Sequence, residues 1–247
     1  MPVQGAQLGG VIEVVLPQRR PLRPLTAFRG SLAQRVHASL REAILSMSLR
    51  PGDILRKPEI CDTLGVSRSP VSEAVARLAV EHLVQVVPQA GTYVARFSLA
   101  EIREGAFLRE ALELAAVERV ARSITEEQLV LLRRNLRLQA GLIEDRDVAG
   151  FYQSDAEMHE LILGFTGFPR LAVVADASWV HVNRARQLIL PQPGRVEATL
   201  HEHLAILAAI EARDPQAARE AVRLHLGKLI GILEPLAQNR PDLFDPE

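Results

Sequence analysis

A chain of 247 residues can form one large domain or two small ones, and its 48% hydrophobic and 24% charged residues are typical of a folded soluble protein. The single cysteine, Cys61, excludes an intrachain disulfide, and no apolar run reaches the roughly 18 residues needed to span a bilayer. The net charge of −1 conceals a division, because residues 1–98 hold 12 Lys and Arg against 7 Asp and Glu, whereas residues 99–247 hold 17 against 23. The basic first part indicates a polyanionic partner. A lone thiol suits a reducing compartment, so we expect a cytoplasmic protein with no membrane partner.

The first 27 residues are predicted to form a flexible basic arm. Arg19, Arg20 and Arg23 lie among three prolines, and such a composition disfavours a packed core. A short apolar run, Val11–Leu16, has the pattern of a small strand.

Two short helices are predicted after this arm. Apolar residues recur every four positions from Leu32 to Ile44, which predicts an amphipathic helix capped by Ser31. A second helix is predicted to start at Pro58 and to end at Gly65.

A third helix and a hairpin complete this part of the chain. Ser67 or Ser69 is expected to cap the third helix, whose apolar positions lie on one face. The β-prone runs 83–87 and 92–94 flank Pro88–Gly91 and predict a hairpin. This order of elements over residues 28–97 is that of a winged helix-turn-helix.

A winged helix-turn-helix binds DNA through the N-terminal end of its last helix, which enters the major groove. Arg68 lies at that end and can donate two hydrogen bonds to guanine. A lone arginine is more often a solvated surface charge, but the ordered set of elements favours a DNA contact. Nearby hydroxyls and basic groups can bind phosphates, and a glycine at the wing tip can approach the backbone. The candidate DNA-binding residues are Arg56, Lys57, Ser67, Arg68, Ser69, Ser72, Arg77, Gly91 and Thr92.

From Leu99 onward the sequence shows only helical patterns, so an all-helical domain is predicted over residues 98–240. Thr125 and Gln128 form a capping box. Breaks are expected at Pro193-Gly194 and Asp214-Pro215. The predicted helices cover residues 99–123, 126–145, 148–165, 169–190, 195–213 and 215–237.

Four residues of this domain could hold a metal ion. Asp155 and His159 are four apart, so both project from one helix face. His203 and His225 lie on the last two predicted helices, and three imidazoles with one carboxylate suit Zn, Ni, Fe or Mn with open positions. Taken alone, an Asp–His pair is more often a surface or capping pair. His201 is an alternative to His203, and the residues by themselves leave that choice open.

Residues 31–95 resemble the DNA-binding domain of the GntR family. Four blocks in the right order carry the resemblance: Leu49–Asp53, Leu64–Val71, Glu73-Ala74 with Arg77-Leu78, and Gly91–Val94.

Three positions depart from the family's pattern. Ser72 stands where relatives carry a DNA-contacting arginine, and His82 stands where the family favours glycine. Pro58 occupies a position that some relatives use for another DNA-contacting arginine, and Lys57 or Arg56 is the candidate substitute.

Residues 99–237 resemble the FCD effector domain of the FadR subfamily. The resemblance rests on Arg109–Glu113, on Asp155 with His159, on Glu202-His203, and on His225-Leu226. It implies an antiparallel helical bundle with a metal and an effector at its centre, and it selects His203 over His201. The implied ligands are Asp155, His159, His203 and His225, with zinc preferred over Ni, Mn or Fe.

The same resemblance implies an effector site beside the metal. Arg109 is expected to pair with the ligand's carboxylate, which a planar guanidinium suits. Arg186, favoured over Arg184, and Asn183 are further candidates, and Glu113 is expected to orient its neighbours.

We therefore expect a homodimeric transcriptional repressor that binds a pseudo-palindromic double-stranded DNA operator and responds to a small carboxylate or hydroxy acid. One alternative is a metal-dependent enzyme using the three-His-one-Asp site. Against it, no general acid or base accompanies the ligands, and the DNA-binding part would have no role. The other alternative is a pure metal sensor, in which the ion itself is the signal.

Overall fold

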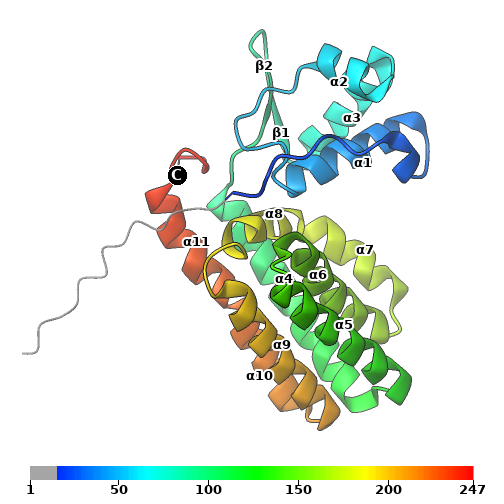
Figure 1. Cartoon of the computed structure of the whole chain (residues 1–247), viewed down its shortest axis with the longest axis vertical. Coiled ribbons are helices and arrows are strands. Elements are labelled where there is room, and N and C mark those ends of the chain that lie inside the picture. The colour runs from blue at the N-terminus through cyan, green and yellow to red at the C-terminus, as the bar shows by residue number, and fades with distance from the viewer. Residues whose placement is uncertain (1–15, 247) are drawn as a thin grey trace, which may run out of the picture.

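The computed structural model describes residues 16–246, which form a small head joined to a larger helical bundle (Figure 1). The head contains η1 (Leu25–Ala27), α1 (Leu32–Leu45), α2 (Lys57–Leu64), α3 (Arg68–Val80), β1 (Val84–Val87) and β2 (Gly91–Val94). The bundle contains α4 (Leu99–Ser123), α5 (Glu126–Glu144), α6 (Val148–Phe165), α7 (Pro169–Ser178), α8 (Val180–Ile189), α9 (Arg195–Glu211), α10 (Pro215–Leu226) and α11 (Lys228–Asn239). The predicted fold class, a winged helix-turn-helix followed by an all-helical domain, is confirmed. No helix within residues 16–246 is long and apolar enough to cross a membrane.

The head is organised around the packing of α1 against α3. The four-residue apolar period of α1 buries Val36, Leu40 and Ile44 against Val71 and Leu78 of α3. Burying such side chains stabilises a fold by about 1.5–3 kcal/mol each. This core fixes the angle at which α3 presents its outer face.

The observed helix ends agree with the capping residues predicted from the sequence. Ser31 caps α1 and Thr125 caps α5, each through the predicted capping box. Gly65 ends α2 with φ 65°, a left-handed conformation that glycine adopts without cost. Asp214 caps α10 by accepting hydrogen bonds from the backbone N–H groups of Gln216 and Ala217.

The wing is a two-stranded antiparallel hairpin in which Val84 pairs with Val94 and Val87 pairs with Gly91. Gly91 has φ 136°, a conformation available to glycine but not to larger residues. The prediction of a hairpin is therefore correct, with each strand beginning one residue from its expected start.

The predicted flexible arm is wrong for the part that the structure describes. Arg19 forms an ion pair with Asp53 at 2.6 Å, and Arg50 donates a hydrogen bond to the carbonyl of Pro17. Leu22 and Leu25 pack against the core of the head. These contacts join residues far apart in sequence, which local composition cannot reveal. The predicted strand at 11–16 lies outside the described residues, apart from its last residue.

Two predicted helices are each divided in two. The expected helix over 169–190 breaks at Trp179, whose φ of −100° and ψ of 5° lie outside the helical region. Trp179 is buried, and its ring lies 5.0 Å from the guanidinium of Arg109. The expected helix over 215–237 breaks at Gly227, where the cap bends the chain so that α11 packs against α8. Neither break carries a proline, so tertiary packing decided both.

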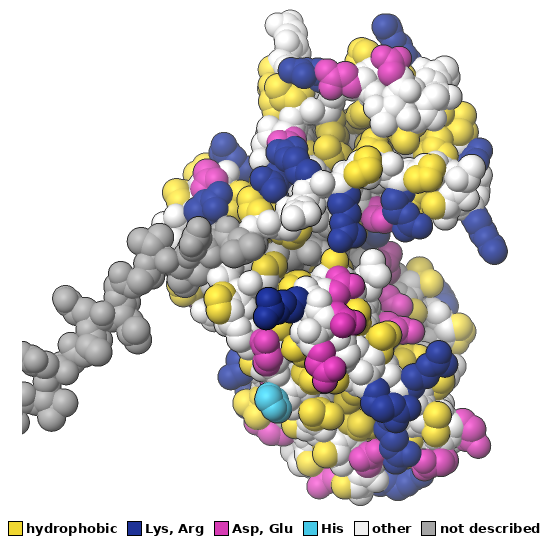
Figure 2. All heavy atoms as spheres, viewed as in Figure 1, with side chains coloured by type: hydrophobic (Ala, Val, Ile, Leu, Met, Phe, Trp, Pro, Cys, Tyr) yellow, Lys and Arg dark blue, Asp and Glu magenta, His cyan; other side chains and the backbone are white. Residues whose placement is uncertain are grey.

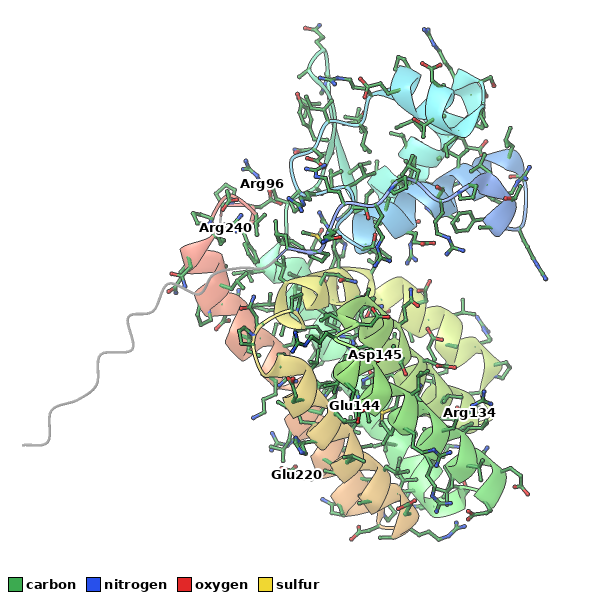
Figure 3. The ribbon with its side chains drawn as sticks, viewed as in Figure 1. Arg96, Arg134, Glu144, Asp145, Glu220 and Arg240 are labelled. Carbon is green, nitrogen blue, oxygen red and sulfur yellow. The ribbon has the colours of Figure 1, made fainter. Side chains whose placement is uncertain are left out.

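The head and the bundle meet at the linker that follows β2. Phe97 is buried, and its backbone forms a parallel bridge with Phe244, beyond the end of α11. Met47, Leu188 and Leu233 belong to the same buried cluster at this junction. Figure 3 places Arg96 and Arg240 close to the same junction. The chain's last described segment thus reinforces the linker.

Charged pairs also cross the gap between head and bundle. Figure 2 shows Lys and Arg side chains along the lower edge of the head above Asp and Glu side chains of the bundle. Arg41 of α1 lies 3.5 Å from Asp176 of α7, and His82 lies 2.5 Å from Glu101 of α4. His82 has φ 56°, which explains why a glycine is favoured at this position.

Candidate metal centre

Four side chains converge in the interior of the bundle. Asp155 and His159 lie on α6, His203 on α9 and His225 on α10. One ligand atom from each lies within 4.8 Å of the others, and all four residues are buried. This is the only such group among residues 16–246. The structure therefore brings together all four residues selected from the sequence.

A hydrogen bond to Nδ1 holds each imidazole in place. The Nδ1 of His159 lies 2.6 Å from Oε2 of Glu113, and that of His225 lies 2.7 Å from Oε2 of Glu202. The Nδ1 of His203 lies 2.8 Å from Oε1 of Gln139. These oxygens are acceptors, so Nδ1 carries the proton and Nε2 keeps its lone pair.

The three Nε2 atoms face a common centre. Those of His159 and His225 are 3.3 Å apart, and that of His203 lies 3.3 Å from Oδ1 of Asp155. Histidine ligands of metals are commonly oriented by a carboxylate or carbonyl on the opposite ring nitrogen. The arrangement here is of that kind.

The electrostatics favour neutral imidazoles beside ionised carboxylates. Burial lowers the pKa of all three histidines, and lowers that of His225 to about 4 despite its hydrogen bond to Glu202. Burial raises the pKa of Glu202, but the hydrogen bonds from His225 and Arg195 outweigh it and bring the value to about 2. At neutral pH Nε2 of each histidine is therefore unprotonated, as metal binding requires.

The site also passes a test of fit to a cation. Oδ1 of Asp155 and Nε2 of His203 are buried without a hydrogen-bond partner, whereas Oδ2 of Asp155 contacts Nη2 of Arg186. Buried polar atoms are rarely left in that state. Three imidazoles and one carboxylate suit a divalent transition metal, and a metal ion at the centre would satisfy these atoms.

A cavity of about 50 Å³ adjoins this centre. Arg109 and Arg186, both predicted effector residues, line it together with Asp155 and His225. Arg195, which the sequence reasoning missed, also lines it. It pairs with Glu202 at 2.7 Å, and its spacing of seven residues from Glu202 on one helix face was the only available signal.

The neighbouring candidates on α8 lie elsewhere. Asn183 does not line the cavity, and its backbone carbonyl accepts a hydrogen bond from Tyr152 at 2.9 Å. Arg184 is fully buried and donates a hydrogen bond to the carbonyl of Ala95 at 2.6 Å. Its guanidinium stacks over Phe97 at 4.5 Å. Arg184 therefore contacts the linker, whereas Arg186 faces the metal centre.

Several candidate DNA-binding residues lie at the exposed N-terminal end of α3. Ser67 occupies the N-cap position of α3, and Arg68, Ser69 and Ser72 follow on its exposed surface. Nζ of Lys57 lies 3.5 Å from Oγ of Ser72, so a cation stands beside the serine that replaces the family's arginine.

Two further candidates form ion pairs within the head, and a third is buried. Arg56 pairs with Glu59 and Arg77 with Glu73, both at the surface. The prediction of Thr92 as a DNA contact is wrong, because its side chain is buried and only 6% exposed. Side chains alternate across a strand, which turns this residue inward while its neighbour Gly91 stays exposed.

Comparison with known proteins agrees with both halves of the chain. The family model described as bacterial regulatory proteins, gntR family, matches residues 32–94, and the FCD domain model matches residues 104–228. The chain is 32% identical over 214 residues to the HTH-type transcriptional repressor RspR of Escherichia coli strain K12, covering 87% of this chain and 94% of that protein. It is 28% identical over 242 residues to the HTH-type transcriptional repressor NanR of Salmonella newport, covering 86% of this chain and 87% of that protein.

The fold is also found among solved structures. The structure of E. coli McbR/YncC matches with a TM-score of 0.73 at 23% identity, covering 84% of this chain and 99% of that one. At this identity the match supports the fold alone.

Proposed function

Because the chain belongs to the GntR family of bacterial regulatory proteins and carries an FCD domain, we propose that it is a homodimeric repressor controlled by a small carboxylate that binds beside a metal ion. It is a DNA-binding transcriptional regulator and not an enzyme, like its relatives. RspR and NanR are both named as repressors, which supports repression here.

The observation that carries this proposal is the buried ligand group beside an arginine-lined cavity. Asp155 and three neutral imidazoles are the donor set for a divalent ion, with zinc as the first candidate. A bound metal would supply a Lewis acid with open positions for an oxygen ligand. Arg109, paired with Glu113 at 2.6 Å, faces the same cavity and suits a carboxylate.

The head supplies the output. Two copies of α3 in a dimer would read a pseudo-palindromic operator, with Arg68 contacting base edges and Lys57 and Ser72 contacting phosphates. The spacing between the two copies of α3 decides whether both fit the DNA at once.

The connection between site and head runs through α8. Arg186 lines the cavity, and Arg184, two residues earlier, holds the linker at Ala95 and Phe97. An effector that binds one arrangement of α8 more tightly would shift the position of the head. A ligand with equal affinity for both arrangements would have no effect.

The experiment is an operator titration with purified dimer, using a DNA site selected from a random library. Elemental analysis and native mass spectrometry first identify the metal and any retained acid. We expect operator affinity to change only when metal and a small carboxylate are both present. An operator affinity that changes with metal alone would support the pure metal sensor. If the dimer binds no duplex more tightly than random DNA, the proposal of a transcriptional regulator is refuted.

A further inference from the structure

Arg186 occupies an unusual position for an effector-binding residue. Its Nη2 contacts Oδ2 of Asp155, one of the four candidate metal ligands. The side chain of Arg186 is 9% exposed and that of Asp155 is 1% exposed, so solvent screens this contact poorly. The aromatic ring of Tyr152 lies 5.0 Å from the guanidinium and supports its face.

The other arginines of the cavity have carboxylate partners that are not metal ligands. Arg109 pairs with Glu113 at 2.6 Å and Arg195 with Glu202 at 2.7 Å. Arg186 alone among these three shares its counter-ion with the proposed metal. A guanidinium stays protonated in proteins, so Arg186 carries its charge at neutral pH.

The charge balance of the cavity therefore depends on the metal. Without metal, each of the three arginines has a carboxylate partner, and the remaining cation of the lining, Lys228, is exposed to solvent. A divalent ion that takes Asp155 as a ligand leaves a surplus of two positive charges, one of them on the buried guanidinium. A buried charge without a partner is strongly unfavourable, so the loaded site requires an anion.

Resting on the proposed function, we infer that Arg186 is an internal substitute for the metal: it neutralises Asp155 in the metal-free protein, and metal binding releases it to bind the effector. The site then accepts an anion only after metal has bound. The cavity of about 50 Å³ is small, which favours a compact anion. The matching effector class is a compact dianion, such as a short dicarboxylate.

This arrangement makes metal and anion binding mutually dependent. If metal raises the affinity for the anion, the anion raises the affinity for metal by the same factor. Arg186 contributes twice, because it competes with metal for Asp155 and then holds the anion. Removing the charge of Arg186 should therefore raise the affinity for metal in the absence of the anion. The same change should abolish the increase in metal affinity that the anion causes.

The test measures zinc affinity by competition with a chelating dye, with and without malonate as the probe dianion. In the wild type we expect malonate to tighten zinc binding about tenfold, within the usual range of coupling factors. In R186Q we expect zinc to bind about tenfold more tightly without malonate, with no further gain when malonate is added. Zinc affinity equal to or weaker than that of the wild type in R186Q would overturn the inference.

Two further variants separate charge from other effects. R186K keeps the charge, so it should bind zinc as weakly as the wild type, and tight binding by R186K would contradict the role of charge. R134Q removes an exposed arginine from the outer face of α5 (Figure 3) and should match the wild type in both measurements. A titration of the dye with zinc and malonate in the absence of protein corrects for zinc that malonate chelates in solution.

A variant of Asp155 distinguishes failure of this inference from failure of the proposed metal site. D155N should weaken zinc binding if the metal site exists. If D155N has no effect, or if the wild type binds no zinc, the proposed metal site fails and the inference fails with it. If D155N weakens zinc binding but R186Q does not strengthen it, only the inference fails.

Discussion

Acid should destabilise the metal-free bundle through the buried histidines, and His225 allows the effect to be worked out. Burial lowers its pKa to about 4 in the folded state, against 6.5 for an exposed imidazole. The stabilisation from keeping it neutral is therefore complete above about pH 6.5 and is lost as pH falls toward 4. Between pH 7 and pH 5 the unfolded imidazole gains a proton and the folded one barely does. The difference is about 2 kcal/mol in the free energy of unfolding.

The assay is urea denaturation in the presence of EDTA, followed by the fluorescence of Trp179. This is the chain's only tryptophan and it is buried in the bundle, so it reports unfolding of that domain. We expect H225Q to lose about 2 kcal/mol less stability than the wild type between pH 7 and pH 5. Glu202 does not interfere, because its pKa of about 2 places its own effect below this range.

The exposed His201, on the same helix as His203, provides the matched control. H201Q should show the wild-type dependence on pH, because this side chain is exposed and lies outside the buried cluster. If H225Q and the wild type lost equal stability over this range, the argument from buried imidazoles would be refuted.

Four other predictions concern the metal, the DNA, the stability of the head and the linker. Q139L removes the acceptor that orients the candidate ligand His203, and it should lower zinc affinity about 10- to 100-fold in a dye competition. An unchanged affinity would show that this hydrogen bond is dispensable. R68A should weaken operator binding by about 1–3 kcal/mol in a gel-shift titration. T92A, at a buried position, should lower the melting temperature of the head and leave operator affinity unchanged. If R68A lowered only the melting temperature and T92A weakened only operator binding, the roles assigned to Arg68 and Thr92 would be reversed. R184K loses the planar group that stacks on Phe97. It should retain wild-type zinc affinity, while its operator affinity should change less than that of the wild type when metal and malonate are added. A change in operator affinity as large as that of the wild type would exclude Arg184 as the connection between the metal centre and the linker.

Much of the architecture was accessible from the sequence because it depends on local patterns. Apolar period and capping residues such as Ser31 and Thr125 gave helices whose observed ends agree closely with prediction. The four candidate ligands also followed from spacing and family resemblance. The histidine choice that spacing left open is resolved by burial, since His203 is buried and His201 is exposed.

The orienting residues of the site were less accessible. Glu113 was expected to orient its neighbours, and it accepts hydrogen bonds from both His159 and Arg109. Gln139 was not identified, because it reaches His203 across 64 positions from another helix. Nothing in the local pattern of α5 distinguishes it from other polar residues.

By itself the sequence determined the order of the elements, the two-part organisation and the residue types able to bind a metal, since side-chain period and capping act within a few positions. Only the tertiary structure decided how Arg184 and Arg186 divide between linker and cavity, where Trp179 and Gly227 interrupt helices, and how the described part of the N-terminal segment attaches to the head. These features depend on the relative rotation and crossing of helices, which arise from the packing of side chains distant in sequence.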